Sequence, residues 1–205
     1  GEVHEISTVR CFEKVMDFVK EEKPDLLIFS GDVLNDEHEE GFRYFTEYMD
    51  GYLGEWLFVP GNHDNDIMLQ KLKIDGVQVR ELEGVRVIGL DDSKRTLSST
   101  QLEQLKHQLS DGKPSILVMH VPVETEHNTE AFQMLGSSFM MHKDRTDANG
   151  QEFIELCENP SAPIAAVLCG HIHGYLKNQL IPGRDQICCS SGMAGFVHRI
   201  TVRGN

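Results

Sequence analysis

The chain has 205 residues, of which 40% are hydrophobic and 25% are charged. This composition is typical of one globular domain with a sizeable core, and it argues against intrinsic disorder. Asp and Glu number 33 against 19 for Lys and Arg, which gives a formal net charge of −14. Such a charge disfavours binding to a nucleic-acid backbone or an anionic membrane, although a local cationic centre can still hold an anionic substrate.

The location of the protein is predicted from what its sequence lacks. No stretch approaches the roughly 20 apolar residues that a membrane span needs, and we find no secretory signal at the start, where the chain opens with Gly1 rather than Met. The cysteines are odd in number, spread along the chain and without CxxC spacing, which favours reduced, mostly buried thiols. We therefore predict a cytoplasmic protein that does not bind membranes.

Helices and short apolar strands alternate along the chain. The first expected helix begins after the N-cap Ser7 and has apolar residues at helical spacing. In chain order, we expect helices at Thr8–Glu22, His38–Met49, Asp66–Leu72 and Ser99–Leu109. We expect buried strands at 26–29, 56–59, Val85–Leu90, Ile116–Met119 and Ala165–Cys169, and antiparallel strands at Tyr175–Leu180, Gln186–Ser190 and Phe196–Val202. The pattern predicts a single α/β domain over residues 1–205, with a mixed sheet and helices on its faces.

Four of the expected strands end in polar residues suited to metal binding. These residues are Asp32, Asn62 with His63, His120, and His171 with His173. Each motif taken alone has an ordinary explanation as a turn or a hydrogen-bonded strand end. In open α/β sheets, however, sites form outside the carboxyl ends of strands, so four such ends together predict one site.

The candidate ligands are imidazole, amide and carboxylate groups, with no cysteine close to them in the sequence. Such a set suits Mn, Fe, Zn, Co or Ni, and it does not suit Ca or a thiolate-selective metal. The choice among the five metals stays open. We expect divalent transition metal ions as cofactors, with manganese among them.

Four segments resemble successive signature blocks of the calcineurin-like metallophosphoesterase superfamily. They are 26–32 (LLIFSGD), 57–64 (LFVPGNHD), 117–122 (LVMHVP) and 168–174 (LCGHIHG). The resemblance implies a mixed β-sandwich of two sheets flanked by helices, with a dinuclear metal centre on loops at the strand ends. It also implies a metal-dependent hydrolase of phosphate esters that uses a metal-bound hydroxide.

The resemblance also implies the ligand of each metal. Asp32 resembles the carboxylate that bridges both ions, and Asn62, His120 and His171 resemble the remaining ligands of one ion. His173 resembles a ligand of the other ion.

Two further residues of the GNHD block resemble catalytic groups. His63 resembles the histidine that binds no metal but contacts the phosphate or the leaving group, where it can donate a proton. Asp64 resembles the residue that orients this histidine.

The chain departs from the family pattern at its start. The family opens with a strand that ends in Asp-x-His, and no such strand precedes Asp32. One explanation is that the strand lies upstream of Gly1; the other is that Glu2 and His4 form a degenerate version and act as weak metal ligands. We favour the first, and we therefore expect a fold without its first strand, only one ion bound, weak activity and a tendency to oligomerise.

The substrate class is predicted less closely. The blocks GDVLN and GNHD differ from those of serine/threonine protein phosphatases, which favours a phosphodiesterase or phosphatase acting on a small phosphate ester or a nucleotide. Residues 121–164 are a candidate cap or insertion, in which Lys143 or Arg145 would bind a second anionic group. The alternative is a packed surface helix followed by a solvated charged loop.

Two other functions remain open. One is a non-catalytic scaffold on the same fold that binds a protein partner, although a scaffold has no need for His63 or the metal ligands. The other is a domain with one structural metal.

Overall fold

The structure is a computed structural model that describes residues 7–33, 39–64, 70–72, 74, 76–134 and 140–203. Its helices are α1 (Thr8–Glu22), α2 (Glu39–Asp50), α4 (Ser99–Leu109), α5 (Thr129–Gln133), α6 (Ala148–Glu158) and the short 3₁₀ helix η2 (Gly192–Ala194). Its strands are β1 (Leu27–Phe29), β2 (Trp56–Phe58), β3 (Gln78–Leu82), β4 (Val85–Gly89), β5 (Ser115–Val118), β6 (Ile164–Cys169), β7 (Leu176–Ile181) and β8 (Arg184–Cys188).

The strands form two sheets. The parallel pair β1–β2 is a sheet of its own, and the other strands form a six-stranded sheet in the order β3-β4-β5-β6-β8-β7. Within that sheet, β4, β5, β6 and β8 are parallel, while the edge strands β3 and β7 are antiparallel to their neighbours. The expected α/β class with a mixed sheet is confirmed. The parallel strands bring their carboxyl ends to one edge, which is where a site is expected.

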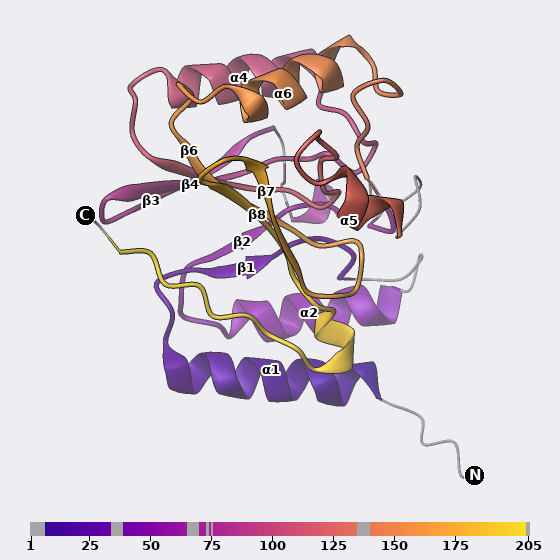
Figure 1. The fold of residues 1–205 in the computed structure, drawn as a ribbon. Coiled ribbons are helices and arrows are strands. Elements are labelled where there is room, and N and C mark those ends of the chain that lie inside the picture. The colour runs from indigo at the N-terminus through magenta and orange to yellow at the C-terminus, as the bar shows by residue number, and fades with distance from the viewer. Residues whose placement is uncertain are drawn as a thin grey trace.

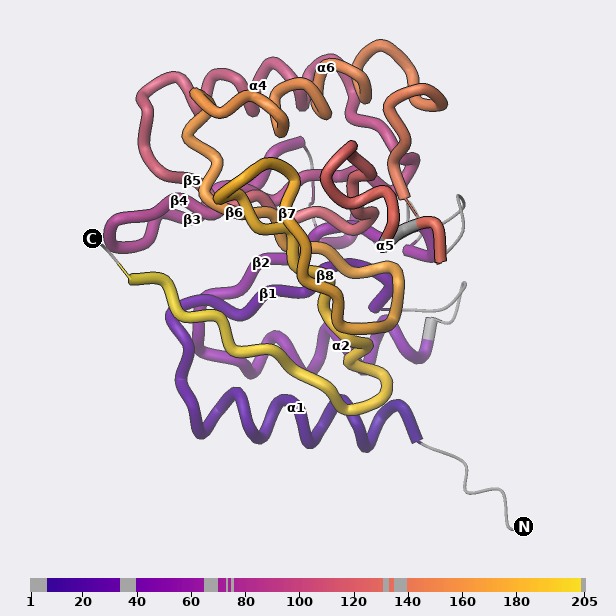
Figure 2. Tube along the Cα trace, in the orientation of Figure 1, coloured from indigo at the N-terminus to yellow at the C-terminus, as the bar shows by residue number. Residues whose placement is uncertain are grey.

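The two sheets lie between two pairs of helices, as Figures 1 and 2 show. One apolar cluster joins α4 and α6 to the six-stranded sheet, with Leu105 and Phe153 fully buried. A second cluster lies between the sheets and includes Leu57 and Val118. A third joins α1 and α2 to β1 through Met16 and Phe45. Burying each such side chain contributes about 1.5–3 kcal/mol, so the layers are held together mainly by apolar contacts.

Two of the predicted helices have the predicted bounds, and both begin with a serine cap. The Ser7 hydroxyl accepts from the Arg10 N–H at the start of α1, and the Ser98 hydroxyl accepts from the Gln101 N–H at the start of α4. Such caps satisfy backbone donors that the helix itself leaves unpaired. At the other end, α1 stops at Lys23, which has a left-handed conformation (φ 48°) and precedes Pro24.

The prediction of a strand at Phe196–Val202 is wrong. Residues 196–203 follow η2 as an extended trace beside α1 (Figure 1), and no strand pairing is recorded for them. Their apolar side chains stay largely exposed, with Phe196 58% and Val202 52% accessible, so burial does not hold them in a sheet. Instead, the Ser190 N–H donates to the His198 ring, which stacks on Tyr175.

Four elements were not predicted: β3, α5, α6 and η2. The edge strand β3 was missed, and so was α6, whose Phe153, Ile154 and Cys157 are fully buried in the main core. Helix α6 lies within the candidate cap 121–164, so part of that segment belongs to the core; a cap over the site stays a prediction. The expected helix at Asp66–Leu72 falls largely on residues outside those described.

The described helices include none that is both long enough and apolar enough to span a membrane. All five cysteines are free: Cys157, Cys169 and Cys188 are buried, and Cys11 and Cys189 are partly buried. Burial raises the pKa of the Cys157 thiol to about 12, which keeps it protonated and unreactive.

Candidate metal centre

The candidate ligands come from loops that follow strands of both sheets. Asp32 and Asn62 follow β1 and β2, whereas His120 and His171 follow the adjacent parallel strands β5 and β6. Because parallel strands end at the same edge, each sheet delivers two of these side chains to one place.

His120 lies at the centre of this group. Its Nε2 atom is 3.1 Å from Asp32 Oδ2, 3.0 Å from His171 Nδ1 and 3.2 Å from Asn62 Oδ1. One ligand atom from each of Asp32, His120 and His171 lies within 4.8 Å of the other two. His120 is 1% exposed, whereas Asp32 and His171 are partly buried and Asn62 is exposed, so the group opens to solvent on the side of Asn62.

The other nitrogen of His120 shows that the ring is oriented for a cation. His120 Nδ1 lies 2.7 Å from the Ser30 carbonyl oxygen, which can only accept, so Nδ1 carries the proton. In the neutral ring, the Nε2 lone pair then faces Asp32, Asn62 and His171. A ring N–H bonded to a carbonyl is the usual support of a metal-binding histidine, and imidazoles with a carboxylate suit a divalent transition metal. The donor set therefore fits a metal ion.

The charges of the group are consistent with this fit. Burial lowers the pKa of His120, but the hydrogen bond and the charge of Asp32 outweigh burial and raise the pKa above its ordinary value. Burial raises the pKa of Asp32, and the contact with His120 outweighs that effect and lowers it. Asp32 and His120 thus each favour the charged form of the other, and a bound cation would compete with a second proton for the Nε2 atom of His120.

Glycines allow the loops of the two sheets to meet at the site. A Cβ atom on Gly61 would lie 2.1 Å from Asp32 Oδ1, and one on Gly31 would lie 2.4 Å from His120 Nδ1. A Cβ atom on Gly170 would lie 2.6 Å from the Ser30 carbonyl oxygen. Gly31 also has φ +89°, a conformation that side chains rarely adopt. The glycines in the SGD, PGNHD and CGHIH motifs are therefore required by close backbone approach.

Asp64 ties two loops of the site together. Its Oδ2 atom accepts from the Asp32 N–H and from the Gly61 N–H, both at 2.8 Å. The His63 N–H in turn donates to Asp32 Oδ1 at 2.9 Å. These contacts hold Asp32 in its left-handed conformation (φ 52°). The orientation of the His63 ring by Asp64 stays a prediction, as does the catalytic role of His63, whose side chain is exposed.

His173 is exposed and lies outside the group formed by Asp32, His120 and His171. Its φ of 54° resembles those of Asp32 and His171, and strained residues of this kind often cluster at functional sites. The predicted ligands Glu2 and His4 fall outside the described residues, as does Asn35 of the GDVLN block. The ligands of a second ion therefore stay a prediction.

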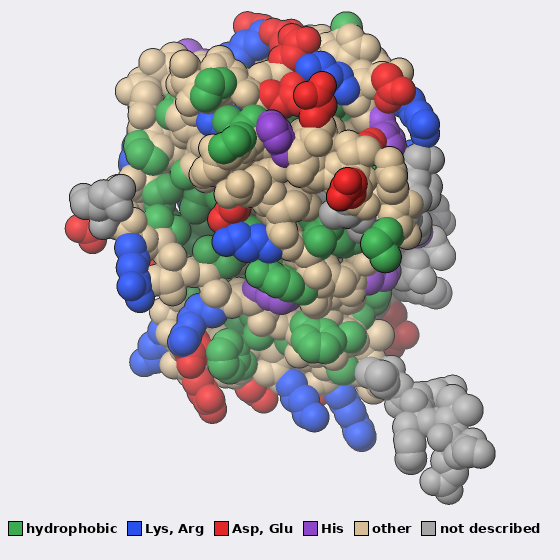
Figure 3. Space-filling model, viewed as in Figure 1, with side chains coloured by type: hydrophobic (Ala, Val, Ile, Leu, Met, Phe, Trp, Pro, Cys, Tyr) green, Lys and Arg blue, Asp and Glu red, His purple; other side chains and the backbone are tan. Residues whose placement is uncertain are grey.

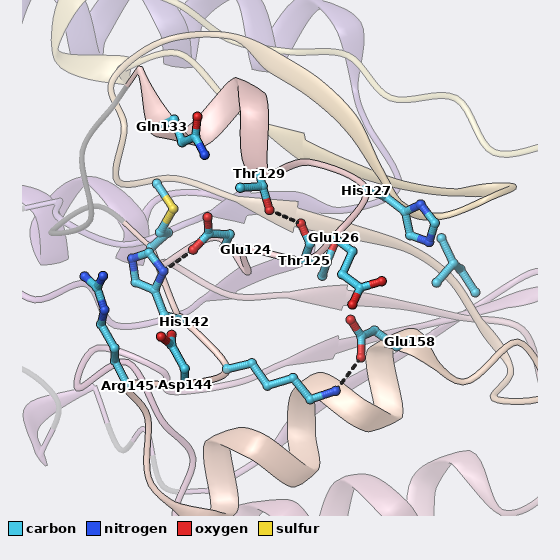
Figure 4. Close-up of a pocket in the computed structure, with 13 residues that line it drawn as sticks. Glu124, Thr125, Glu126, His127, Thr129, Gln133, His142, Asp144, Arg145 and Glu158 are labelled. Atoms are coloured by element: carbon cyan, nitrogen blue, oxygen red, sulfur yellow. Dashed lines mark hydrogen bonds and ion pairs between the residues drawn. The ribbon is translucent and has the colours of Figure 1, made fainter.

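Lys143 and Arg145 line a polar cavity of about 770 Å³ with Glu124, Glu126, His142 and Glu158 (Figure 4). Lys143 Nζ lies 2.8 Å from Glu158 Oε2, and His142 pairs with Glu124. None of the metal-centre residues lines this cavity. Because Glu158 already neutralises Lys143, a role of Lys143 in binding an anion stays a prediction.

Asp92 was not among the site residues predicted from the sequence. This residue is fully buried, and its carboxylate accepts from the backbone N–H groups of His120 and Val121 at 2.7 and 2.9 Å. Burial raises its pKa to about 7. Asp92 follows the apolar run of β4, so the strand-end rule that selected Asp32 and His120 also applies to it.

Several known proteins are similar to this chain. A protein of Arcobacter nitrofigilis named "Probable glycerophosphodiester phosphodiesterase GpdQ" is 28% identical over 74% of this chain and 57% of its own length. The 3',5'-cyclic adenosine monophosphate phosphodiesterase CpdA of Escherichia coli K12 is 24% identical over 83% of this chain and 63% of its own length. The chain thus spans less than two thirds of the length of either relative.

The fold also has a match among solved structures. A dimetal phosphatase from Danio rerio superposes with a TM-score of 0.64 at 11% identity, covering 91% of this chain and 78% of that protein. The sequence profile described as "Calcineurin-like phosphoesterase" matches residues 3–175, which include the clustered ligand residues Asp32, His120 and His171. The chain belongs to the calcineurin-like phosphoesterase family.

Proposed function

We propose that this chain is a metal-dependent phosphodiesterase domain that hydrolyses a small phosphate ester or a nucleotide. The observation that carries the proposal is the meeting of Asp32, Asn62 and His171 within 3.2 Å of the His120 Nε2 atom. The names of the relatives, a glycerophosphodiester and a cyclic-nucleotide phosphodiesterase, support the diester class.

In this proposal, Asp32, Asn62, His120 and His171 hold one divalent ion, and Asp32 with His173 contributes to a second. Bound in such a pair, divalent metal ions neutralise phosphate charge and lower the pKa of a water molecule. They also give a strongly acidic protein a local attraction for an anionic substrate. On the face shown in Figure 3, by contrast, acidic and basic side chains are interspersed and form no extended basic surface.

The protein's own acid–base group in this proposal is His63. It follows Asn62 directly, its backbone N–H is anchored on Asp32, and its side chain is exposed to an incoming substrate. From there, an imidazolium can donate a proton to the oxygen of the leaving group. Asp64 supports this role by holding the loop, through its bond to the Gly61 N–H. Lys143 and Arg145 stay a proposed second anion-binding pair.

The experiment is a metal titration combined with an assay. The wild-type chain, His120→Ala and the control His107→Ala are stripped of metal and titrated calorimetrically with Mn²⁺ and Zn²⁺; hydrolysis of bis(p-nitrophenyl) phosphate is then measured. His107 lies on the exposed side of α4 and serves as the matched control. We expect binding and hydrolysis by the wild type and the control, and loss of both in His120→Ala.

Two results would contradict the proposal. Metal binding without any hydrolysis would favour a structural metal or a scaffold. Hydrolysis that survives in His120→Ala would place the active site elsewhere.

A further inference from the structure

We propose that Asp92 is a positioning residue of the metal centre. Its carboxylate accepts hydrogen bonds from the backbone N–H groups of His120 and Val121 and so sets the direction in which the His120 ring points. The inference rests on the proposed function, because the role of His120 as a ligand is part of that function. Asp92 bonds to the backbone of His120 and is not one of the clustered ligand residues Asp32, His120 and His171, so its effect passes through His120.

Both oxygens of the carboxylate are used. Oδ1 accepts from the His120 N–H at 2.7 Å, and Oδ2 accepts from the Val121 N–H at 2.9 Å. Since these N–H groups are consecutive along the chain, the carboxylate holds the peptide on each side of the His120 Cα atom. Asp92, His120 and Val121 are all at most 1% exposed, so water does not supply an alternative acceptor.

A side chain supplies the acceptor here because the backbone pairing between the segments of β4 and β5 ends before His120. The Leu90 N–H donates to the Val118 carbonyl, which is the last backbone hydrogen bond recorded between the β4 and β5 chains. Beyond that bond, the N–H groups of His120 and Val121 still point to the β4 side. Asp92, two residues after Leu90, supplies the acceptors that the strand itself no longer offers.

His120 is therefore fixed from three directions. Asp92, from the segment after β4, holds its N–H group; Gly170, after β6, donates its N–H to the His120 carbonyl at 3.0 Å. Ser30, after β1, accepts from the ring Nδ1 at 2.7 Å. With the backbone and Nδ1 both held, the remaining ring nitrogen has one direction left, toward Asp32 and His171.

The choice of Asp over Asn follows from the same geometry. A carboxylate offers an acceptor to each of the two N–H donors, whereas an amide offers one oxygen and turns an NH₂ group toward the other donor. Asp92→Asn thus keeps the size of the side chain and reverses the polarity of one contact, which makes it the sharpest test.

The test compares Asp92→Asn with Asp91→Asn. Asp91 is the neighbouring carboxylate, and it accepts from the N–H and hydroxyl groups of Ser93 rather than from His120. Zn²⁺ affinity is measured by calorimetry, and the ring nitrogens of His120 are followed by ¹⁵N NMR. Folding is checked by circular dichroism and urea unfolding. We expect Asp92→Asn to weaken Zn²⁺ binding about 10–100-fold and to shift the His120 ring signals, because outer-shell substitutions have effects of this size. Asp91→Asn should stay within about twofold of the wild type.

A second variant keeps the test decisive if Asp92→Asn does not fold. Asp92→Glu retains the buried charge and adds one methylene group, which displaces the oxygens without removing an acceptor, so we expect a smaller loss of affinity together with shifted His120 signals. A folded Asp92 variant that loses stability but binds Zn²⁺ as the wild type does, with unmoved His120 signals, would overturn the inference. A wild-type chain that binds no metal would instead overturn the proposed function, and the inference with it.

Discussion

The two sheets deliver their side chains to the metal centre in different ways. His120 comes from the six-stranded sheet; it is 1% exposed and bonded on its N–H, its carbonyl and its ring nitrogen. Asn62 and His63 come from the loop after the two-stranded sheet, and both are exposed. His120 is therefore buried and held by bonds from both sheets, including the one from Ser30 after β1, whereas the loop after β2 presents exposed groups.

The difference suggests a division of labour. Groups that bind an ion must be placed accurately, and the six-stranded sheet supplies the most buried of them. A group that meets the substrate must be reachable, and the exposed loop with His63 meets that requirement. Substitutions on either side of the metal centre can test this division of labour.

The largest effect is expected from His63→Ala. If His63 donates a proton to the leaving group, its loss should lower turnover about 10²–10⁴-fold and leave the metal content unchanged. Asn62→Ala is the matched neighbour: its Oδ1 atom lies 3.2 Å from His120 Nε2, so it should lose metal as well as activity. Elemental analysis and kcat of both variants check this. If His63→Ala lost the metal while Asn62→Ala kept it, their roles would be exchanged.

Gly61→Ala tests whether the loops after β1 and β2 depend on one another for their positions. The added Cβ atom would lie 2.1 Å from Asp32 Oδ1, so the Asp32 carboxylate must leave its position beside His120 or the loop must shift. A misplacement of about 1 Å can cost about 10²-fold in rate, and we expect a loss of that order in kcat/KM. The control is Gly192→Ala, where no atom lies within 4 Å of the added Cβ atom. Equal activity of the two variants would show that the loops are not interlocked.

Much of the site and the fold was predictable because the signals are local. The first helix combines a serine cap with apolar spacing, and its predicted bounds are those observed. Polar residues that follow apolar strands predicted one group of Asp32, Asn62, His120, His171 and His173. The structure brings the first four together and leaves His173 outside the group. That rule works because parallel strands share an edge, whatever the remainder of the fold does.

The misses come from contacts between residues far apart in the chain. The sequence of β3, Gln78–Leu82, is polar enough to read as a loop, and it becomes a strand through its antiparallel pairing with β4. Residues 196–202 have apolar residues suited to a strand but no recorded strand pairing. The strand-end rule applies to Asp92 as a site residue, but its hydrogen bond to His120 spans 28 positions and does not follow from that rule.

The smallest expected effect lies entirely on the side of the six-stranded sheet. Arg86 of β4 is largely buried, and it forms ion pairs with Glu81 at 2.6 Å and with Asp111 at 2.8 Å. The hydrogen bond from Arg86 lowers the pKa of Asp111 to about 2. The ordinary value is about 3.9. The carboxylate is therefore easier to ionise in the folded chain than in the unfolded one.

The sign of the pH dependence follows from this lowered pKa. The pair contributes stability that is fully present above the unfolded pKa of about 4 and is lost as the pH falls through about 2. Asp111→Asn should therefore unfold at a lower urea concentration than the wild type at pH 6, and the difference should shrink toward pH 2.5. Because Asp111 is half exposed, solvent screens the pair and the shift should be modest. Zn²⁺ affinity at pH 6 should be unchanged, since Arg86 lies at the far end of β4 from Asp92. A loss of metal affinity in Asp111→Asn would mean that the six-stranded sheet transmits strain along its whole length, and that its rigidity at His120 is not a local property.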